Sequence, residues 1–163
     1  MENLKQNVIK LLCENARYTN AQMAAMLGED EKKISQMVKS LEKEGVIVKY
    51  SAILDTEVMA KKSVQALIEV KVAPQKLNGF DSYAEEIYNF DEVTSLYLMS
   101  GGFDLAVFVE GETLSDIANF VSSKLSVIEG IVGVQTHFIL KKYKIEGQVT
   151  KSKVENKRQI IQA

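Results

Sequence analysis

Residues 19–47 decide the fold of this chain and read TNAQMAAMLGEDEKKISQMVKSLEKEGVI. Thr19 is followed three residues later by Gln22, which is the spacing of a capping box and predicts the start of a helix. Gly28 predicts the end of that helix, because glycine tolerates the left-handed conformation of a C-terminal cap. Asp30 is a good N-terminal cap, so a second helix is expected to begin directly after it.

The second of these helices is expected to end at Gly45, and its apolar residues recur at steps of three and four. They are Ile34, Met37, Val38 and Leu41. Another amphipathic helix comes before the pair, and its apolar face consists of Leu4, Val8, Leu11 and Leu12. Three helices in this order predict a helix-turn-helix, whose last helix enters the major groove of DNA. Residues 46–53 begin with a β-branched run and predict a short strand or wing.

The charge of the chain does not by itself indicate DNA binding. The net charge is −2, with 20 basic and 22 acidic side chains among 163 residues. Residues 1–62 carry 10 basic and 9 acidic side chains, residues 63–145 carry 6 and 11, and residues 146–163 carry 4 and 2. Affinity for phosphate would therefore have to come from local clusters of lysine rather than from a global positive field.

From residue 63 onward the apolar residues follow a different period. Residues 64–72 alternate between apolar and mostly polar side chains, which predicts a strand. The following segments predict a helix near 80–87, strands over 93–99 and 104–109, a helix over 114–128 and a strand over 134–143. Gly101 and Gly102 predict a tight hairpin turn with positive φ. This order indicates a ferredoxin-like βαββαβ domain, so the fold class is α+β.

One face of the predicted sheet lacks helices to cover it. Its apolar residues are expected to be Leu96, Leu98, Phe108 and Ile139. A second copy of the chain would cover them. The expected domains are a winged helix-turn-helix over 1–50, a hinge over 51–62, the ferredoxin-like effector-binding and oligomerisation domain over 63–145 and a basic tail over 146–163. The tail is expected to be mobile or weakly helical.

Four segments in order resemble the Lrp/AsnC family of transcriptional regulators. They are ARYTN at 16–20, VKSLEKEGVI at 38–47, YSAILD at 50–55 and MSGGFDL at 99–105. The resemblance spans roughly residues 3 to 145. It implies a homodimer, often assembled into tetramers or octamers, that binds double-stranded DNA at paired half-sites. It also implies modulation by a small effector, typically an amino acid, held between C-terminal domains.

The outward face of the predicted third helix supplies the candidate DNA-binding residues. They are Lys32, Lys33, Ser35, Gln36, Lys39 and Ser40. Lysine contacts phosphate without sequence preference, whereas Gln36 can pair with adenine through two hydrogen bonds. Polar residues at these positions also fit an ordinary solvated helix face, and the resemblance favours DNA. Relatives often carry arginine where this chain has Met37, so affinity is expected to be modest and strongly dependent on salt.

The turn at Gly101 and Asp104 matches the family's effector turn. The resemblance implies that its amides and carboxylate hold the carboxylate and ammonium groups of an amino acid. Family members usually carry a larger polar residue at the position of Gly102, so the resemblance does not identify the effector. The further candidate pocket residues, from their positions, are Leu98, Ser100, Thr136 and Phe138.

An enzyme is the main alternative, because siroheme-pathway decarboxylases resemble the same family. Their polycarboxylate substrates call for arginine and histidine, and residues 63–145 contain His137 but no arginine. A metabolite sensor with weak DNA binding is a third possibility. No catalytic residue, cofactor or metal site is expected, since phosphate- and dinucleotide-binding fingerprints are missing and Cys13 lies far from His137 in sequence. The lone cysteine and the lack of a long apolar run favour a cytoplasmic protein without membrane contact.

Overall fold

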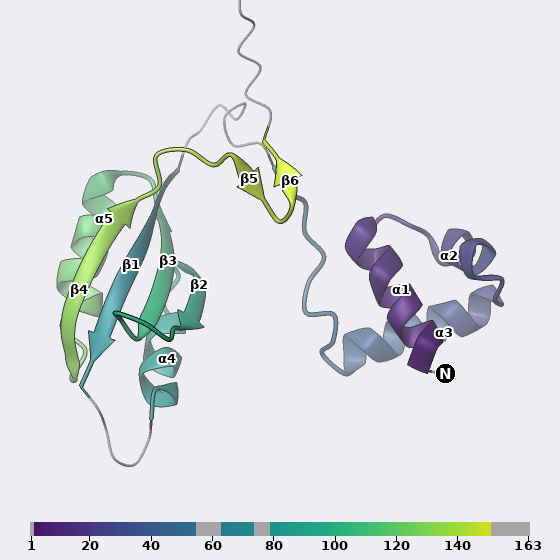
Figure 1. The fold of residues 1–163 in the computed structure, drawn as a ribbon, viewed down its shortest axis with the longest axis horizontal. Coiled ribbons are helices and arrows are strands. Elements are labelled where there is room, and N and C mark those ends of the chain that lie inside the picture. Colours follow the sequence, from purple (N-terminus) through teal and green to yellow (C-terminus); the bar gives the residue numbers. More distant parts are fainter. Residues whose placement is uncertain (1, 55–62, 74–78, 151–163) are drawn as a thin grey trace, which may run out of the picture. The chain divides into compact units, whose positions relative to one another are not determined.

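A computed structural model describes residues 2–54, 63–73 and 79–150, and the expected hinge residues 55–62 lie outside this part of the chain. The chain divides into two compact units, Met1–Ile53 and Leu54–Ala163 (Figure 1). The first unit is helical, and the second contains a sheet with two helices. None of the helices in the described segments is both long and apolar enough to cross a membrane.

The first unit contains three helices, α1 (Glu2–Glu14), α2 (Asn20–Leu27) and α3 (Glu31–Lys43). Their apolar faces meet in a small core whose fully buried members come from all three helices. These members are Val8, Met23, Ala24, Ile34 and Leu41. The predicted helix-turn-helix is therefore confirmed, and the buried positions of α3 are two of the four that the periodicity identified.

The ends of α2 and α3 follow the predicted capping signals. The Thr19 hydroxyl accepts a hydrogen bond from the backbone N–H of Gln22, whose side chain accepts one from the N–H of Thr19. Gly28 adopts φ 65° and ends α2 in the left-handed region. The Asp30 carboxylate accepts hydrogen bonds from the backbone N–H groups of Lys32 and Lys33 and so caps α3. These bonds satisfy donors that a helix start would otherwise leave unpaired.

Gly45 ends α3 with paired hydrogen bonds that satisfy its last carbonyls. With φ 70° at Gly45, its N–H donates to the Glu42 carbonyl and the N–H of Val46 donates to Leu41. This is the Schellman arrangement. The predicted strand over residues 46–53 is wrong, because no strand is assigned there and Val48 is 91% exposed. A strand needs a neighbour for its backbone groups, and no described strand of this chain pairs with the segment.

The second unit is built on a four-stranded antiparallel sheet. Its strands are β1 (Val64–Val72), β2 (Val93–Leu98), β3 (Leu105–Gly111) and β4 (Ile131–Phe138), in the order β2-β3-β1-β4. Two helices, α4 (Asp81–Tyr88) and α5 (Leu114–Phe120), lie on one face of this sheet (Figure 1). The element order confirms the predicted βαββαβ fold.

The core lies between that face and the two helices. Alternate residues of β1 point into it and are fully or almost fully buried: Ala66, Ile68, Val70 and Val72. They pair with β3 and β4, so that Ile68 lies opposite Val107 on one side and Thr136 on the other. The helices contribute large apolar side chains, namely Tyr83, Ile87, Ile117 and Phe120. Because side chains alternate along a strand, the intervening residues of β1 point to the uncovered face.

The prediction that Leu96 lies on the uncovered face is wrong. Leu96 pairs with buried Val107 and packs against the core. The pairing of β2 with β3 shifts between Val93 and Ser95, and a one-residue shift moves every later side chain to the opposite face. Leu98, opposite buried Leu105, therefore also belongs to the helix-covered face, although it is 60% exposed at the end of its strand.

The predicted helix over 114–128 is α-helical only over Leu114–Phe120. Residues Val121–Leu125 form a π-helical segment, in which the N–H of Ser126 donates to the Val121 carbonyl. The hydroxyls of Ser122 and Ser123 both donate to the carbonyl of Asn119, and such bonds compete with regular α-helical bonding.

Lys124 lies in the π-helical segment. Its ammonium group contacts the Glu92 carboxylate at 2.5 Å and lies 5.6 Å from the centre of the Phe90 ring. The hydrogen bond from Lys124 lowers the pKa of Glu92. These contacts hold the π-helical segment against Phe90 and Glu92, just before β2.

The chain after β4 also departs from expectation, because β4 ends at Phe138 rather than continuing to residue 143. Two short strands, β5 (Lys144–Ile145) and β6 (Gln148–Val149), form a separate hairpin (Figure 1). Glu146 and Gly147 at its tip adopt φ 46° and 81°, as a two-residue primed turn requires. Residues 146–149 are therefore neither helical nor irregular, while residues 151–163 of the expected tail lie outside the described chain.

Replacing Gly130 with alanine is expected to destabilise the sheet unit. Gly130 adopts φ 90°, and an added Cβ would lie 2.1 Å from the Tyr83 hydroxyl oxygen. Overpacking and left-handed strain together predict a loss of about 3 kcal/mol in the free energy of unfolding. Urea unfolding of the full chain measures it. The matched control is Gly101→Ala, which meets open space and should change stability by less than about 0.5 kcal/mol; equal stability of both variants would contradict this account.

Candidate nucleic-acid interface and effector loop

Helix α3 presents the six candidate DNA-binding residues on its outward side. Ile34 and Leu41 are fully buried and hold the opposite side against the core of the first unit. Lys32, Lys33, Gln36, Lys39 and Ser40 are exposed, and Ser35 is half-buried. The structure thus brings all six onto one surface of one helix. No contact with DNA tests their role.

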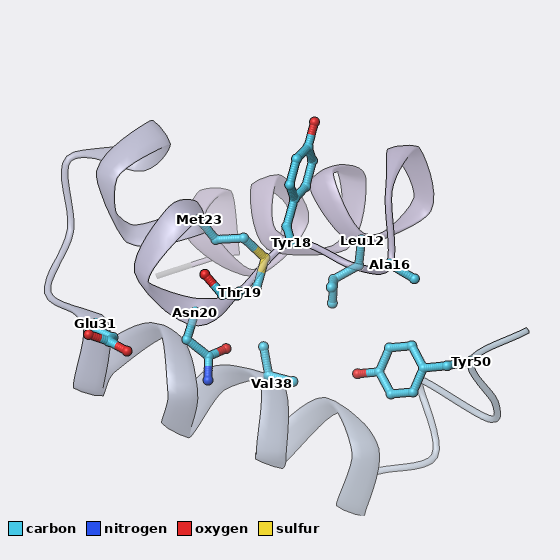
Figure 2. A pocket seen from close by; sticks show the side chains of 9 residues that line it. All are labelled: Leu12, Ala16, Tyr18, Thr19, Asn20, Met23, Glu31, Val38 and Tyr50. Atoms are coloured by element: carbon cyan, nitrogen blue, oxygen red, sulfur yellow. The ribbon is translucent and has the colours of Figure 1, made fainter.

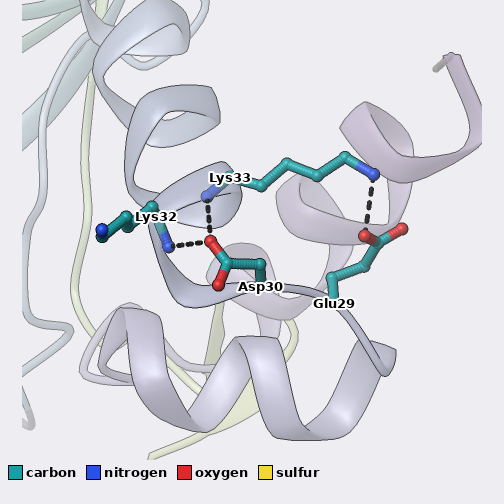
Figure 3. Close-up of polar contacts among 4 residues, drawn as sticks. All are labelled: Glu29, Asp30, Lys32 and Lys33. Atoms are coloured by element: carbon teal, nitrogen blue, oxygen red, sulfur yellow. Dashed lines mark hydrogen bonds and ion pairs between the residues drawn. The ribbon is translucent and has the colours of Figure 1, made fainter.

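Carboxylates of the same unit engage two of the six. The Lys33 ammonium contacts the Glu29 carboxylate at 2.7 Å, whereas the Lys32 side chain extends in another direction (Figure 3). The Ser40 hydroxyl donates to Glu44. Hydrogen bonds from the Lys5 ammonium and then from Ser40 lower the pKa of Glu44, which lies at the surface. These contacts compete with phosphate, and the i,i+4 spacing of both pairs would have revealed them in the sequence.

The candidate effector loop connects β2 to β3 over residues 99–104. Asp104 makes three hydrogen bonds, two of which hold this loop to the end of β1, while the third closes the loop itself. Its carboxylate accepts from the N–H of Val72 at 2.9 Å, its own N–H donates to Val70 at 3.0 Å, and its carbonyl accepts from Met99 at 2.8 Å. Asp104 therefore has a structural role that the sequence did not indicate.

Gly101 and Gly102 do not form the predicted tight turn with positive φ. Neither residue lies in the left-handed region, and a Cβ on either would meet no atom within 4 Å. The hydrogen bond from the N–H of Met99 to the carbonyl of Asp104 closes a loop that is longer than a two-residue turn. The two glycines thus leave open space beside exposed backbone, which suits the close approach of another group.

The predicted pocket residues fall into two groups within one chain. Leu98, Ser100, Gly101 and Asp104 lie at the β2–β3 connection, whereas Thr136 and Phe138 lie on β4. Leu98 on β2 and Phe138 on β4 belong to opposite edges of the sheet, about 14 Å apart across three strand spacings. Asp104, by contrast, is hydrogen-bonded to β1, the strand next to β4.

The uncovered face of the sheet is partly apolar. Leu67 lies opposite Phe108, and Phe108 packs edge-to-face against Tyr97 with ring centres 5.9 Å apart. On the same face His137 Nε2 lies 3.2 Å from the Glu69 carboxylate. The prediction that Phe108 lies on this face is confirmed. Tyr97 was not predicted here, because the register of β2 shifts between Val93 and Ser95.

The first unit also contains a cavity of about 410 Å³ that the sequence reasoning did not find (Figure 2). All three helices contribute to its walls, and Tyr50 stands at one end with its ring directed inward. Its hydroxyl donates to Glu42 at 3.0 Å. Burial, followed by that hydrogen bond, raises the pKa of Tyr50. No cluster of three or more metal-ligating side chains occurs among the residues described.

Comparison with known families covers both units. Residues 1–48 match a winged helix-turn-helix DNA-binding domain, and residues 65–149 match the Lrp/AsnC ligand binding domain. The chain belongs to the Lrp/AsnC family. The family match reaches residue 149 and so includes the β5–β6 hairpin.

Curated Lrp/AsnC-type relatives match this family member over most of their length. YugG of Bacillus subtilis (strain 168), an uncharacterized HTH-type transcriptional regulator, is 44% identical over 155 residues, which cover 94% of this chain and 93% of YugG. LrpA of Pyrococcus horikoshii, also an HTH-type transcriptional regulator, is 29% identical over 137 residues, 84% of this chain and 94% of LrpA.

Solved structures share the same fold. Escherichia coli AsnC aligns with a TM-score of 0.68 at 19% identity, covering 89% of this chain and 95% of AsnC. The regulator NMB0573 from Neisseria meningitidis, solved as an L-Met complex, aligns with a TM-score of 0.70 at 23% identity, covering 89% and 93%. At these identities the likeness establishes the fold.

The hydrogen bond between Asp104 and Val72 leads to a prediction about the stability of the second unit. Asp104→Ala leaves the N–H of Val72 without its acceptor and should lower the free energy of unfolding by about 2 kcal/mol. Asp104→Asn keeps an oxygen acceptor and should cost less than half of that. Urea unfolding of both variants measures the difference. Equal losses would show that the hydrogen bond to Val72 contributes nothing.

Proposed function

We infer that this Lrp/AsnC family member is a transcriptional regulator that binds double-stranded DNA and responds to a small metabolite. The observation that carries this conclusion is the joining, in one chain, of a helix-turn-helix unit and a ligand binding domain of one regulator family. The relatives carry the same combination over at least 84% of this chain. With DNA as its partner, it is expected to act in the cytoplasm.

We propose that α3 is the helix that enters the major groove. Lys32 and Lys39 are exposed on it and are the cations best suited to phosphate, while Gln36 between them is suited to reading a base edge. Lys33 and Ser40 would first have to leave Glu29 and Glu44. Binding to DNA would thus cost Lys33 and Ser40 their present contacts, and this cost supports a modest affinity.

We propose that the regulator assembles through the uncovered face of its sheet. Leu67, Tyr97 and Phe108 give this face an apolar centre, and burying such a surface against a second copy would be favourable. A two-fold pair would cover both copies with one surface. Tetramers and octamers are further possibilities within this proposal.

We propose an amino acid as the effector, bound near Gly101 and Asp104. The open space at the glycines and a carboxylate on the same loop support this assignment. The neighbour NMB0573, solved with L-Met, also favours it. Thr136 and Phe138 lie opposite the core residues Ile68 and Ala66, on the helix-covered side of β4, so they would join this site only through a contact other than the uncovered face.

The enzyme alternative receives no support from the comparisons, since YugG, LrpA and NMB0573 are all transcriptional regulators. A metabolite sensor with weak DNA binding keeps one favourable observation, the engagement of Lys33 and Ser40 by carboxylates. The DNA-binding measurement below separates this sensor from a regulator.

Lys39→Ala is expected to weaken binding to a duplex from the upstream region of the protein's own gene. Loss of a phosphate contact should reduce the slope of log K against log salt by about 0.9 for each copy that contacts DNA. Fluorescence anisotropy over a salt series measures it, with a scrambled duplex beside it. Lys10→Ala, an exposed lysine on α1, is the matched control. A slope unchanged by Lys39→Ala would refute the placement of α3, and wild-type binding that ignores sequence would favour the sensor.

Phe108→Lys is expected to dissociate the assembly by placing a charge in the centre of the uncovered face. Native mass spectrometry and light scattering of the full chain measure the mass, and circular dichroism verifies the fold. Ser115→Lys, on the exposed side of α5, should leave the mass unchanged. A wild-type protein that is monomeric at working concentrations, or an unaltered mass for Phe108→Lys, would exclude assembly through this face.

A further inference from the structure

The cavity in the helix-turn-helix unit is formed by residues that do not belong to the ligand binding domain. Every residue that lines it belongs to the first 50 residues, whereas the family's ligand binding domain covers residues 65–149. The cavity is open to solvent on one side, and its volume of about 410 Å³ falls within the range of roughly 300 to 1,000 Å³ that is usual for small-molecule clefts. The cavity is therefore large enough for a ligand that has no connection with the effector loop.

The cavity has an apolar side formed by all three helices. Leu12 comes from α1, Met23 from α2 and Val38 from α3. Figure 2 shows Val38 directed into the space between α3 and the other two helices. Apolar surface of this kind gains from contact with a hydrocarbon body that excludes water.

The polar side of the cavity favours a cation over an anion. Glu31, at the start of α3, lies at one end of the cavity, and Asn20 points toward α3 beside it (Figure 2). At the other end the Tyr50 hydroxyl donates a hydrogen bond to the Glu42 carboxylate. None of the described residues lining the cavity is lysine or arginine. A carboxylate ligand would meet like charge here, whereas an ammonium group would meet a carboxylate and an amide oxygen.

We propose that the helix-turn-helix unit carries a second small-molecule site, which binds a primary amine with a short apolar body. The ammonium group lies at Glu31 and Asn20, and the apolar body lies along Leu12, Met23 and Val38. This chemistry differs from that of an amino-acid effector, whose carboxylate the site would repel. Because the occupant contacts α2 and α3 together, it fixes the angle between the two helices that a groove of DNA must fit.

Fluorine NMR of the full chain labelled with 3-fluorotyrosine tests the proposal without DNA. The chain has six tyrosines, of which Tyr18 and Tyr50 line the cavity. Cyclohexylmethylamine should shift these two resonances saturably and leave those of the second unit, such as Tyr97, unchanged. Cyclohexanecarboxylate, which has the same ring and the opposite charge, should bind more weakly. Single tyrosine-to-phenylalanine variants assign the signals.

Two substitutions separate binding in the cavity from binding elsewhere. Ala16→Met places a larger side chain at a lining position and should weaken amine binding at least tenfold, whereas Ala25→Met on the exposed side of α2 should not. Glu31→Gln should weaken binding roughly threefold, because the carboxylate is exposed and its ion pair correspondingly modest. Glu14→Gln on α1 is its control.

Several results would overturn the proposal. They are shifts confined to Tyr97 and the other tyrosines of the second unit, equal affinity for the amine and the carboxylate, or unchanged affinity in a folded Ala16→Met variant. If that variant fails to fold, the comparison of Glu31→Gln with Glu14→Gln decides, and equal affinities reject the site. Because none of these readouts involves DNA or the effector loop, failure here leaves the regulator function untouched.

Discussion

The placement of β1 between β3 and β4 is the constraint on which the second unit depends. Because β1 pairs on both sides, its alternation of side chains fixes the faces of all its neighbours. The side chains of Ile68 and Val70 lie in the core, so those of the alternate residues Leu67 and Glu69 lie on the opposite face. The end of the same strand receives the Asp104 carboxylate at Val72. One register thus determines the core, the uncovered face and the anchor of the candidate effector loop.

This constraint has a consequence for any effector site. The antiparallel order β2-β3-β1-β4 puts β2 and β4 at separate edges, while the β2–β3 connection reaches β1 through Asp104. The Asp104 carboxylate already accepts a hydrogen bond from the Val72 amide, so a second partner must use its remaining lone pairs. If a second copy also contributes to the proposed site, ligand binding would be linked to assembly through the differential affinity that allosteric coupling requires.

The sequence allowed the order of elements, the two units and the capped ends of α2 and α3 to be predicted, because those features depend on local signals. Features set by pairing were predicted less well. Leu96 was assigned to the wrong face because a bulge beside Val93 has no signature in the alternation. The π-helical segment keeps the apolar spacing of an α-helix, so the pattern around Leu125 could not reveal it. The role of Asp104 depends on Val72, which is 32 residues away in the chain.

If α3 enters the major groove as proposed, its own contacts make assembly important for DNA binding. Lys33 is held by Glu29 and the Ser40 hydroxyl by Glu44, so these two reach phosphate only by breaking contacts of their own, and Lys32 and Lys39 are left as the readiest cations. Each copy then gains little from the electrostatic term that supplies most non-specific affinity. When two copies are linked, binding of the first raises the effective concentration of the second at its own half-site. Tight binding would therefore come from paired half-sites. Affinity for DNA would then follow the state of assembly, and a ligand held between copies could control transcription without touching α3.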